Sequence, residues 1–257
     1  MRLLPLPALA DNYVWTLATP DGEAVVVDPG EAGPVVQAAS EGLRPHVVLL
    51  THHHPDHVGG TATLRERWPG LRVIAPDDER IDTATERVGD GDRIVAGPWR
   101  FQVLAIPGHT RSHIAFASDD ADGPLFCGDT LFSLGCGRMF EGTPPQMLAS
   151  LDRLAALPDG MQVCCGHEYT LANAAFAVAV EPGNPAVAAR RHQAEAQRAA
   201  GRPTLPSTLA DERAANPFLR VDVAEVRDTV ARRLRRKPAD RVEVFAELRR
   251  WKDGFRA

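Results

Sequence analysis

The sequence predicts an α/β body followed by an all-helical C-terminal segment. Through about the first two-thirds of the chain, short apolar segments bounded by Gly, Pro or Asp alternate with segments of helical periodicity. This alternation is typical of sheets covered by helices. After Glu168 the strand signals stop and only helical patterns follow. We therefore place a domain boundary near residue 167, between a domain 1–167 and a domain 168–257.

Each element rests on its own local pattern. Seven apolar segments predict strands, at Glu23–Val27, His46–Leu50, Arg72–Ala75, Phe101–Ile106, His113–Ala117, Leu125–Cys127 and Gln162–Cys165. Apolar residues at three- and four-residue steps predict helices within the body, at Thr61–Trp68 and Gln146–Leu157. Four more helices are predicted after the boundary, at Leu171–Val180, Ala186–Ala200, Asp222–Arg236 and Ala239–Trp251.

Composition narrows the class of protein. A chain of 257 residues with 44% hydrophobic and 25% charged residues is typical of a globular protein with a buried core. No apolar run reaches the ~18 residues that a membrane span needs. The apolar stretch at the N-terminus is broken by Pro5 and Pro7, so we interpret it as a strand and its loop and not as a signal peptide. The four cysteines lack CxxC spacing, which favours reduced thiols in a cytoplasm.

Charge is distributed unevenly along the chain. Residues 220–257 hold 12 Lys/Arg and 7 Asp/Glu, which gives a net charge of +5. Because the whole chain has a net charge of −5, residues 1–219 have a net charge of −10. Such a basic tail could bind nucleic acid, recognise a small anionic ligand, or form a solvated helix face. Because the tail has no Gly/Arg repeats, we expect no nucleic-acid binding.

The segment THHHPDHVGG follows an apolar strand and leads into a helix. Side chains at the carboxyl end of a buried strand are held rigidly and face the cleft where α/β folds place their sites. Alternate residues of an extended chain point to opposite sides, so His52 and His54 share a face and His53 points away. The proline that follows stiffens the turn that presents Asp56 and His57. The motif is therefore H-x-H-x-D-H, in which His52, His54, Asp56 and His57 are candidate ligands of a bound ion. His53 is not one of these candidates.

Three more candidate ligands follow predicted strands. They are His109 in IPGHT, Asp129 in FCGDT and His167 in CCGHEY. Each is preceded by a glycine, which lets backbone and ligand crowd around a centre. Isolated histidines are usually surface or satisfied core residues, but this many at strand ends predicts a metal site. Histidine and carboxylate ligands suit Zn²⁺, Fe and Mn.

These motifs resemble those of known proteins. THHHPDH with GHT, GDT and GHEY resembles the metallo-β-lactamase superfamily, and GCGRMFEGT, CGHEYT, NPFLR and LRRWKD resemble the glyoxalase II family, the hydroxyacylglutathione hydrolases. The resemblance extends from LPALADNYVW to LRRWKD, nearly the whole chain. It implies a metallo-β-lactamase-type αββα sandwich over 1–167, which binds metal, followed by a small all-helical C-terminal domain over 168–257, which binds glutathione.

The resemblance implies two divalent metal ions, with Zn²⁺ preferred and Fe or Mn as alternatives. Its ligand positions map onto His52, His54 and His109 for one ion, Asp56, His57 and His167 for the other, and Asp129 as the bridge between them. All seven positions are filled without substitution.

The implied reaction is hydrolysis of S-(2-hydroxyacyl)glutathione thioesters by a hydroxide that bridges the two metal ions. S-D-lactoylglutathione would give D-lactate and glutathione, the second step of methylglyoxal detoxification. Asp56 and Asp129 are the expected catalytic residues, because Asp56 can also orient the hydroxide and Asp129 bridges the ions. Asp28, in VVVDPG, is either a partner of a ligand histidine or a turn-capping residue.

The glutathione moiety carries two carboxylates, so cationic side chains are expected to bind it. On a helical wheel centred on Leu248, Arg249 and Lys252 border the apolar face and Arg250 points to solvent. Charges in that position are either snorkelling ends or ligand contacts. The resemblance assigns both to glutathione binding, together with Arg138, Tyr169 and Phe140, the last of which stands where some members have a tyrosine.

We expect the thioesterase to be a monomer, to be cytoplasmic and to bind no membrane. Several other functions are alternatives to this activity. Within the same fold, the rivals are a lactonase or β-lactamase, and a persulfide dioxygenase with a single iron. A nucleic-acid-processing enzyme is suggested only by the basic tail. The C-terminal LRRWKD segment favours the thioesterase over the first two, and salt-sensitive RNA binding would be the sign of the third.

Overall fold

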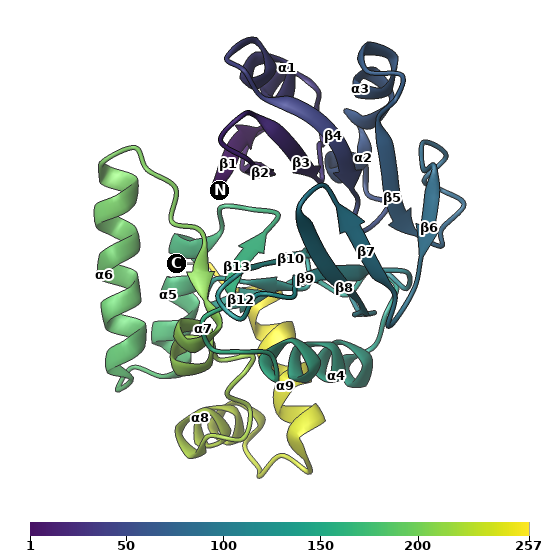
Figure 1. Cartoon of the computed structure of the whole chain (residues 1–257). Helices are drawn as coiled ribbons and strands as arrows, with labels where there is room; N and C mark the ends of the chain where they lie inside the picture. Colours follow the sequence, from purple (N-terminus) through teal and green to yellow (C-terminus); the bar gives the residue numbers. More distant parts are fainter. Residues whose placement is uncertain (257) are drawn as a thin grey trace. The chain divides into compact units, whose positions relative to one another are not determined.

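Six strands from the first third of the chain form one sheet in sequence order in the computed structural model, which describes residues Met1–Arg256 (Figure 1). The strands are β1 (Arg2–Ala8), β2 (Asn12–Ala18), β3 (Glu23–Val27), β4 (Arg44–Leu49), β5 (Arg72–Pro76) and β6 (Glu86–Val88). The first three pair antiparallel, and β3 to β6 pair parallel. Parallel strands end at the same edge of a sheet, so the loops after β3 and β4 lie close together.

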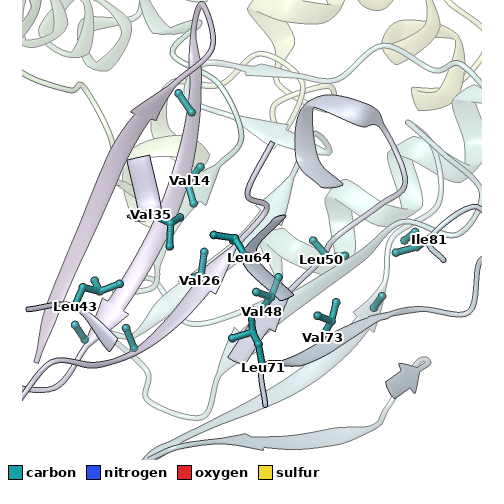
Figure 2. Packing of buried hydrophobic residues seen from close by; sticks show 14 residues of the cluster. Val14, Val26, Val35, Leu43, Val48, Leu50, Leu64, Leu71, Val73 and Ile81 are labelled. Atoms are coloured by element: carbon teal, nitrogen blue, oxygen red, sulfur yellow. The ribbon is translucent and has the colours of Figure 1, made fainter. Parts of the chain in front are cut away.

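Two helices cover one face of this sheet. They are α1 (Gly33–Ser40) and α3 (Thr61–Arg67), and the short α2 (Pro55–Val58) lies between β4 and α3. Val35 of α1 and Leu64 of α3 pack with Val14, Val26 and Val48 of the strands in one buried cluster (Figure 2). This core holds the carboxyl ends of β3 and β4 in place.

Four antiparallel strands form the next part of the chain. They are β7 (Arg93–Ala96), β8 (Trp99–Ala105), β9 (Ile114–Ser118) and β10 (Pro124–Gly128), paired in the order β7-β8-β9-β10. Phe101 of β8 and Phe126 of β10 are buried with ring centroids 5.9 Å apart.

The remaining elements are mostly helical. They are the hairpin of β11 (Leu131–Phe132) and β12 (Gly135–Cys136), α4 (Pro144–Ala155), β13 (Gln162–Cys165), α5 (Thr170–Val180), α6 (Pro185–Ala199), β14 (Ser207–Thr208), α7 (Leu209–Ala215), α8 (Ala224–Leu234) and α9 (Arg241–Asp253). A buried cluster joins the β11–β12 turn to α5, α6 and α7 through Leu134, Ala174, Val187 and Ala215.

The described residues divide into two units that are not simple halves of the sequence. Unit 1 comprises Met1–Ala105, Ser112–Gly128 and Cys164–Glu168, and unit 2 comprises Ile106–Arg111, Asp129–Val163 and Tyr169 onward. Both sheet regions described above lie in unit 1. The C-terminal helices lie in unit 2 with the loop Ile106–Arg111 and the segment Asp129–Val163, which contains the β11–β12 hairpin and α4. The boundary near residue 167 remains a proposal about domains.

The predicted elements are confirmed with small shifts at their ends. The strands Glu23–Val27 and Gln162–Cys165 have the predicted bounds. The last helix begins at Arg241, two residues later than predicted, because the Asp240 side chain accepts a hydrogen bond from the backbone N–H of Glu243 and caps it. The helices α1, α2 and α7 were not predicted from the sequence. Among the described residues, no helix is long and apolar enough to span a membrane.

Candidate metal centre

Asp56, His57 and His167 come together in unit 1. Their donor atoms all lie within 4.8 Å of one another. The Oδ2 atom of Asp56 is 3.6 Å from Nε2 of His57 and 3.4 Å from Nε2 of His167. Two donors each ~2.1 Å from a tetrahedral ion lie about 3.4 Å apart, so this spacing fits a bound cation. The two histidines are buried and the Asp56 side chain is 40% exposed, which leaves one side of the site open.

Local structure explains how α2 presents this pair. His54 is the N-cap of α2 with extended backbone, and the Pro55 ring occupies the first helical position. One helical turn then places Asp56 and His57 next to each other. The imidazole of His52 lies 4.1 Å from that of His57 and 4.7 Å from that of His54, measured between ring centroids. The loop after β4 therefore gathers four of the predicted ligands.

His109 and Asp129 form the corresponding pair in unit 2. Nε2 of His109 lies 3.5 Å from Oδ2 of Asp129, and both side chains are buried. Gly137 packs against this pair so closely that a Cβ atom there would lie 1.9 Å from the backbone oxygen of Asp129. Five of the seven predicted ligands thus belong to unit 1 and two to unit 2.

Four of the candidate histidines have Nδ1 fixed by a hydrogen bond. The acceptors are Thr51 Oγ1 for His52 (3.0 Å), Asp28 Oδ2 for His57 (3.0 Å), the Arg138 backbone oxygen for His109 (2.8 Å) and Asp11 Oδ1 for His167 (2.8 Å). Carboxylate and carbonyl oxygens only accept, so the proton is on Nδ1 and the lone pair is on Nε2. The donor set therefore fits metal ions bound through Nε2.

The Asp28 carboxylate accepts three of the hydrogen bonds that hold the candidate ligands in unit 1. Its Oδ1 accepts from the backbone N–H of Thr51 (2.8 Å), and its Oδ2 accepts from the Thr51 hydroxyl (2.6 Å) and from Nδ1 of His57. The hydroxyl proton is used on Asp28, so Nδ1 of His52 donates to Thr51. Of the two interpretations that the sequence left open for Asp28, the structure supports the partner of a ligand histidine.

The Asp28 network makes a prediction about metal affinity. Asp28→Asn would place an amide N–H₂ against donors. It would break the hydrogen bond from the Thr51 N–H if it replaced Oδ1, or those from the Thr51 hydroxyl and His57 if it replaced Oδ2. We expect metal affinity to fall by about 10- to 100-fold. A competition titration with a chromogenic chelator measures it, with Asp82→Asn, at an exposed carboxylate, as the control. Unchanged affinity in the Asp28 variant would show that its carboxylate does not support the metal ligands.

A glycine makes room for the same network. Gly128 has φ +47°, and a Cβ atom there would lie 2.4 Å from Thr51 Oγ1 and 2.8 Å from Cε1 of His113. The His113 ring stacks on His52 with ring centroids 4.6 Å apart and an interplanar angle of 14°. His113 is therefore a packed residue beside the ligands.

His53 is directed elsewhere. Its Nδ1 lies 3.5 Å from Oδ2 of Asp78, and it belongs to none of the groups of metal-binding geometry among the described residues. Asp78 is itself held by a forked pair of bonds from Arg80 and by the Ser112 hydroxyl. The Arg80 guanidinium keeps the pKa of Asp78 well below its usual range. These contacts support the interpretation of His53 as a non-ligand.

Charged side chains of unit 2 cluster beside the β11–β12 hairpin. Arg249 is only 5% exposed and donates to the backbone oxygen of Cys136 (2.7 Å) and to Asp253 (3.0 Å). Arg138 lies 3.5 Å from the same Asp253 carboxylate. Lys252 donates to the Ala172 backbone oxygen (3.2 Å). Burial, reinforced by the neighbouring Arg249 charge, lowers the pKa of Lys252 to about 8.

The two remaining predicted contacts are aromatic. Phe140 is 65% exposed, and its ring stands edge-on to His109 with centroids 5.2 Å apart. Tyr169 precedes α5 and packs edge-on against Phe132, also at 5.2 Å. Within unit 2, Phe140 and Arg138 therefore lie next to a predicted metal ligand. Burial raises the pKa of the Cys136 thiol to about 11, which favours the protonated thiol over the thiolate at neutral pH.

Comparison with known proteins agrees with these features. The metallo-β-lactamase superfamily model matches residues 10–167, and the model of the hydroxyacylglutathione hydrolase C-terminus matches residues 168–255. A hydroxyacylglutathione hydrolase of Xanthomonas axonopodis pv. citri is 59% identical over 258 residues, covering 100% of both chains. The chain belongs to the hydroxyacylglutathione hydrolase family. A second member, from Xylella fastidiosa strain M23, is 58% identical over 99% of this chain and 98% of its own.

Solved structures place this family member among metallo-β-lactamase folds. The ETHE1 structure from Myxococcus xanthus has a TM-score of 0.65 at 25% identity and covers 99% of this chain and 100% of its own. The BLEG-1 B3 metallo-β-lactamase has a TM-score of 0.64 at 23% identity, over 85% and 98% of the two chains. The metallo-β-lactamase αββα sandwich with a helical C-terminal part is thus confirmed as the fold class.

Two residues of this hydroxyacylglutathione hydrolase family member support candidate ligands but were not predicted from the sequence. Asp11 fixes Nδ1 of His167, and Asn12 Nδ2 lies 3.1 Å from Oδ2 and 3.2 Å from the backbone oxygen of Asp56. Both lie in the DNY of the quoted LPALADNYVW segment, more than 40 residues from the ligands that they support. The only available signal was two polar side chains in a loop directly before a strand of buried residues.

Proposed function

We propose that this chain hydrolyses S-(2-hydroxyacyl)glutathione thioesters, converting S-D-lactoylglutathione to D-lactate and glutathione. The observation that carries the proposal is the full-length similarity to hydroxyacylglutathione hydrolases in a chain whose histidines and Asp56 form groups that could hold a metal ion. Such a reaction would be the second step of methylglyoxal detoxification.

The proposed site comprises seven ligands for two divalent ions. One ion would be held by His52, His54 and His109, the other by Asp56, His57 and His167, with Asp129 as the bridge. Zn²⁺ is preferred for this ligand set, and Fe and Mn are alternatives. Bound there, the ions would supply a hydroxide nucleophile near neutral pH and stabilise the oxyanion of the attacked thioester.

The side chains contribute by holding and orienting. Asp56, open to solvent on one side and fixed by Asn12, is placed to orient the attacking water as well as to bind metal. Asp28 and Asp11 keep the proton of His57 and His167 on Nδ1. The glutathione thiolate is a good leaving group because thiols have pKa values near 8.5, so no general acid is needed.

Unit 2 offers the groups that would bind glutathione. Arg249, Lys252 and Arg138 supply the positive charge for its carboxylates, and Tyr169 supplies a hydroxyl. Phe140 lacks the hydroxyl that a tyrosine would offer, so at this position it contributes only apolar contact. We propose domain 168–257 as the glutathione-binding part and 1–167 as the metal-binding part, in a monomer.

The lowered pKa of Lys252 makes a prediction about pH dependence. The protonated ammonium binds a carboxylate, and with a pKa of about 8 it is lost as the pH rises above that value. We expect kcat/KM, which reports the free enzyme, to fall above about pH 8. Lys252→Arg should abolish this fall because a guanidinium stays charged. If the fall persists in this variant, the titrating group is not Lys252.

Three further assignments belong to the same proposal. We expect a cytoplasmic protein, which fits the four buried free cysteines among the described residues. We expect no nucleic-acid binding, which a salt titration with RNA would test. Size-exclusion chromatography with light scattering would test the monomer.

A comparison of substrates tests the function. The purified enzyme, with its metal content measured, is assayed with S-D-lactoylglutathione, with a lactone, with a β-lactam, and with glutathione persulfide while oxygen uptake is recorded. We expect thiol release from the thioester at a kcat/KM at least a hundredfold above that of the other substrates. A single iron with oxygen uptake and no thioester hydrolysis would establish the dioxygenase instead.

A further inference from the structure

The β11–β12 hairpin connects two parts of the site within unit 2. Asp129 lies two residues before Leu131, and Arg138 lies two residues after Cys136. The hairpin is closed by antiparallel pairing of its four strand residues and by the hydrogen bond from Gly137 N–H to the Thr130 backbone oxygen (3.2 Å). The position of the hairpin therefore fixes the position of Asp129 before it and of Arg138 after it.

Side chains of the C-terminal helices hold this hairpin at five consecutive residues. The contacts are Asn216 Nδ2 to the backbone oxygens of Phe132 (3.0 Å) and Gly135 (2.9 Å), Asn173 Nδ2 to that of Ser133 (3.0 Å), Arg190 Nη2 to Ser133 Oγ (3.0 Å), the Leu134 N–H to Glu212 Oε2 (2.7 Å), and Arg249 Nη1 to the Cys136 backbone oxygen (2.7 Å). Four helices, α5, α6, α7 and α9, and the residue that ends α7 take part.

Glu212 and Asn216 form the centre of these contacts. Glu212 is fully buried, and its Oε2 accepts from both the Leu134 N–H and Asn216 Nδ2 (3.0 Å). Asn216 is also fully buried, and its Oδ1 accepts from the Phe218 N–H (3.1 Å), which fixes the orientation of the amide. Burial raises the pKa of Glu212, so the neutral form is favoured relative to an exposed carboxyl group.

Two glycines, one in the hairpin and one directly after it, pack closely against their neighbours. A Cβ atom on Gly135 would lie 2.4 Å from Nδ2 of Asn173, and one on Gly137 would lie 1.9 Å from the Asp129 backbone oxygen and 3.2 Å from Nδ1 of His109. The Arg138 backbone oxygen in turn accepts the Nδ1 proton of His109. A displacement of the hairpin would therefore reach both candidate ligands of unit 2.

We propose that Glu212, with Asn216, is a positioning residue for metal binding, because it fixes the hairpin that sets Asp129 and His109. The C-terminal helices then support the metal ligands in addition to binding the substrate. This inference rests on the proposed metal site, but it concerns residues that touch neither metal nor substrate. It also gives a role to the NPFLR segment, which begins at Asn216.

The test compares two substitutions of Glu212 with a matched control. Glu212→Gln keeps an oxygen that accepts from Leu134 and Asn216, and its amide can donate to Ser207, whose side chain faces the same carboxyl group. Glu212→Ala removes the acceptor. Glu181 is also a buried glutamate of unit 2, and its carboxylate accepts two charged hydrogen bonds, at 2.8 and 3.0 Å, from Arg220, which lies outside the hairpin. Glu181→Ala therefore reports general destabilisation.

Metal affinity by chelator competition, melting temperature, kcat and KM are measured for each variant in the full chain. We expect Glu212→Ala to weaken affinity for at least one ion about 10- to 100-fold and to lower kcat more than it raises KM. Glu212→Gln should stay within about threefold of the wild type. Glu181→Ala should lower the melting temperature but leave metal affinity unchanged.

Either of two results overturns the inference: Glu212→Ala binds metal like the wild type, or Glu181→Ala loses as much affinity. If Glu212→Ala does not fold, Asn173→Ala removes a single contact to Ser133 and decides the matter, with an affinity loss of at least about threefold expected and an unchanged affinity contradicting the proposal. A wild-type enzyme that binds metal without hydrolysing thioesters would refute the proposed function and leave this comparison valid.

Discussion

His54→Ala should reduce the bound metal from two ions per chain to about one and lower kcat by about a thousandfold. The substitution removes one of three proposed ligands of an ion that would supply several kcal/mol of charge stabilisation in the transition state. About 4 kcal/mol corresponds to a factor of a thousand in rate. Metal analysis by mass spectrometry and steady-state kinetics measure both effects.

The neighbouring histidine provides the control. His53 is adjacent in sequence, but it contacts Asp78 and lies outside the groups of metal-binding geometry. His53→Ala should keep both ions and a kcat within about threefold of the wild type. Loss of metal from His53→Ala together with retention in His54→Ala would show that the alternation of side chains assigned these ligands wrongly.

Arg249→Ala should raise KM by about 10- to 100-fold and change kcat much less. A hydrogen bond to a charged group is worth about 1.5–3 kcal/mol, and each 1.4 kcal/mol is a factor of ten in binding. An interaction made equally with substrate and transition state affects KM and leaves kcat. The hairpin keeps the contacts of Asn216, Asn173 and Glu212, which limits the effect on the metal ligands.

Arg250 is the matched control for Arg249. It is the next residue of α9, its side chain is 71% exposed, and it pairs with Glu247. Arg250→Ala should leave KM within about twofold. A collapse of kcat at constant KM in Arg249→Ala would mean that the guanidinium acts in the chemical step or on the metal ligands and not in substrate binding.

The strand ends were the most predictable part of the site. Composition and periodicity placed β4, β8, β10 and β13 within two residues, and the candidate ligands follow these strands in the structure. The alternation rule also separated His53 from its neighbours. These features could be predicted because the alternation of side chains along a strand, and the backbone restrictions of proline and glycine, depend only on neighbouring residues.

The supporting contacts could not be predicted from the sequence. Asp11 and His167 are 156 residues apart, and Leu134 and Glu212 are 78 apart, so no spacing or periodicity links them. The helical wheel placed Arg249 at the border of the buried face, whereas the structure buries it, because the Cys136 backbone oxygen and the Phe218 ring receive the guanidinium. Contacts of this kind join residues that are far apart in the sequence, so they can be identified only from the folded structure.

The most direct test of the proposed two-metal thioesterase is a metal titration of the stripped enzyme. The ions are removed with a chelator, Zn²⁺ is added back in fractions of an equivalent, and hydrolysis of S-D-lactoylglutathione is measured at each step. We predict that activity is absent without metal and reaches its maximum only when about two ions per chain are bound. Full activity in the metal-free enzyme, or at one ion per chain, would contradict the account.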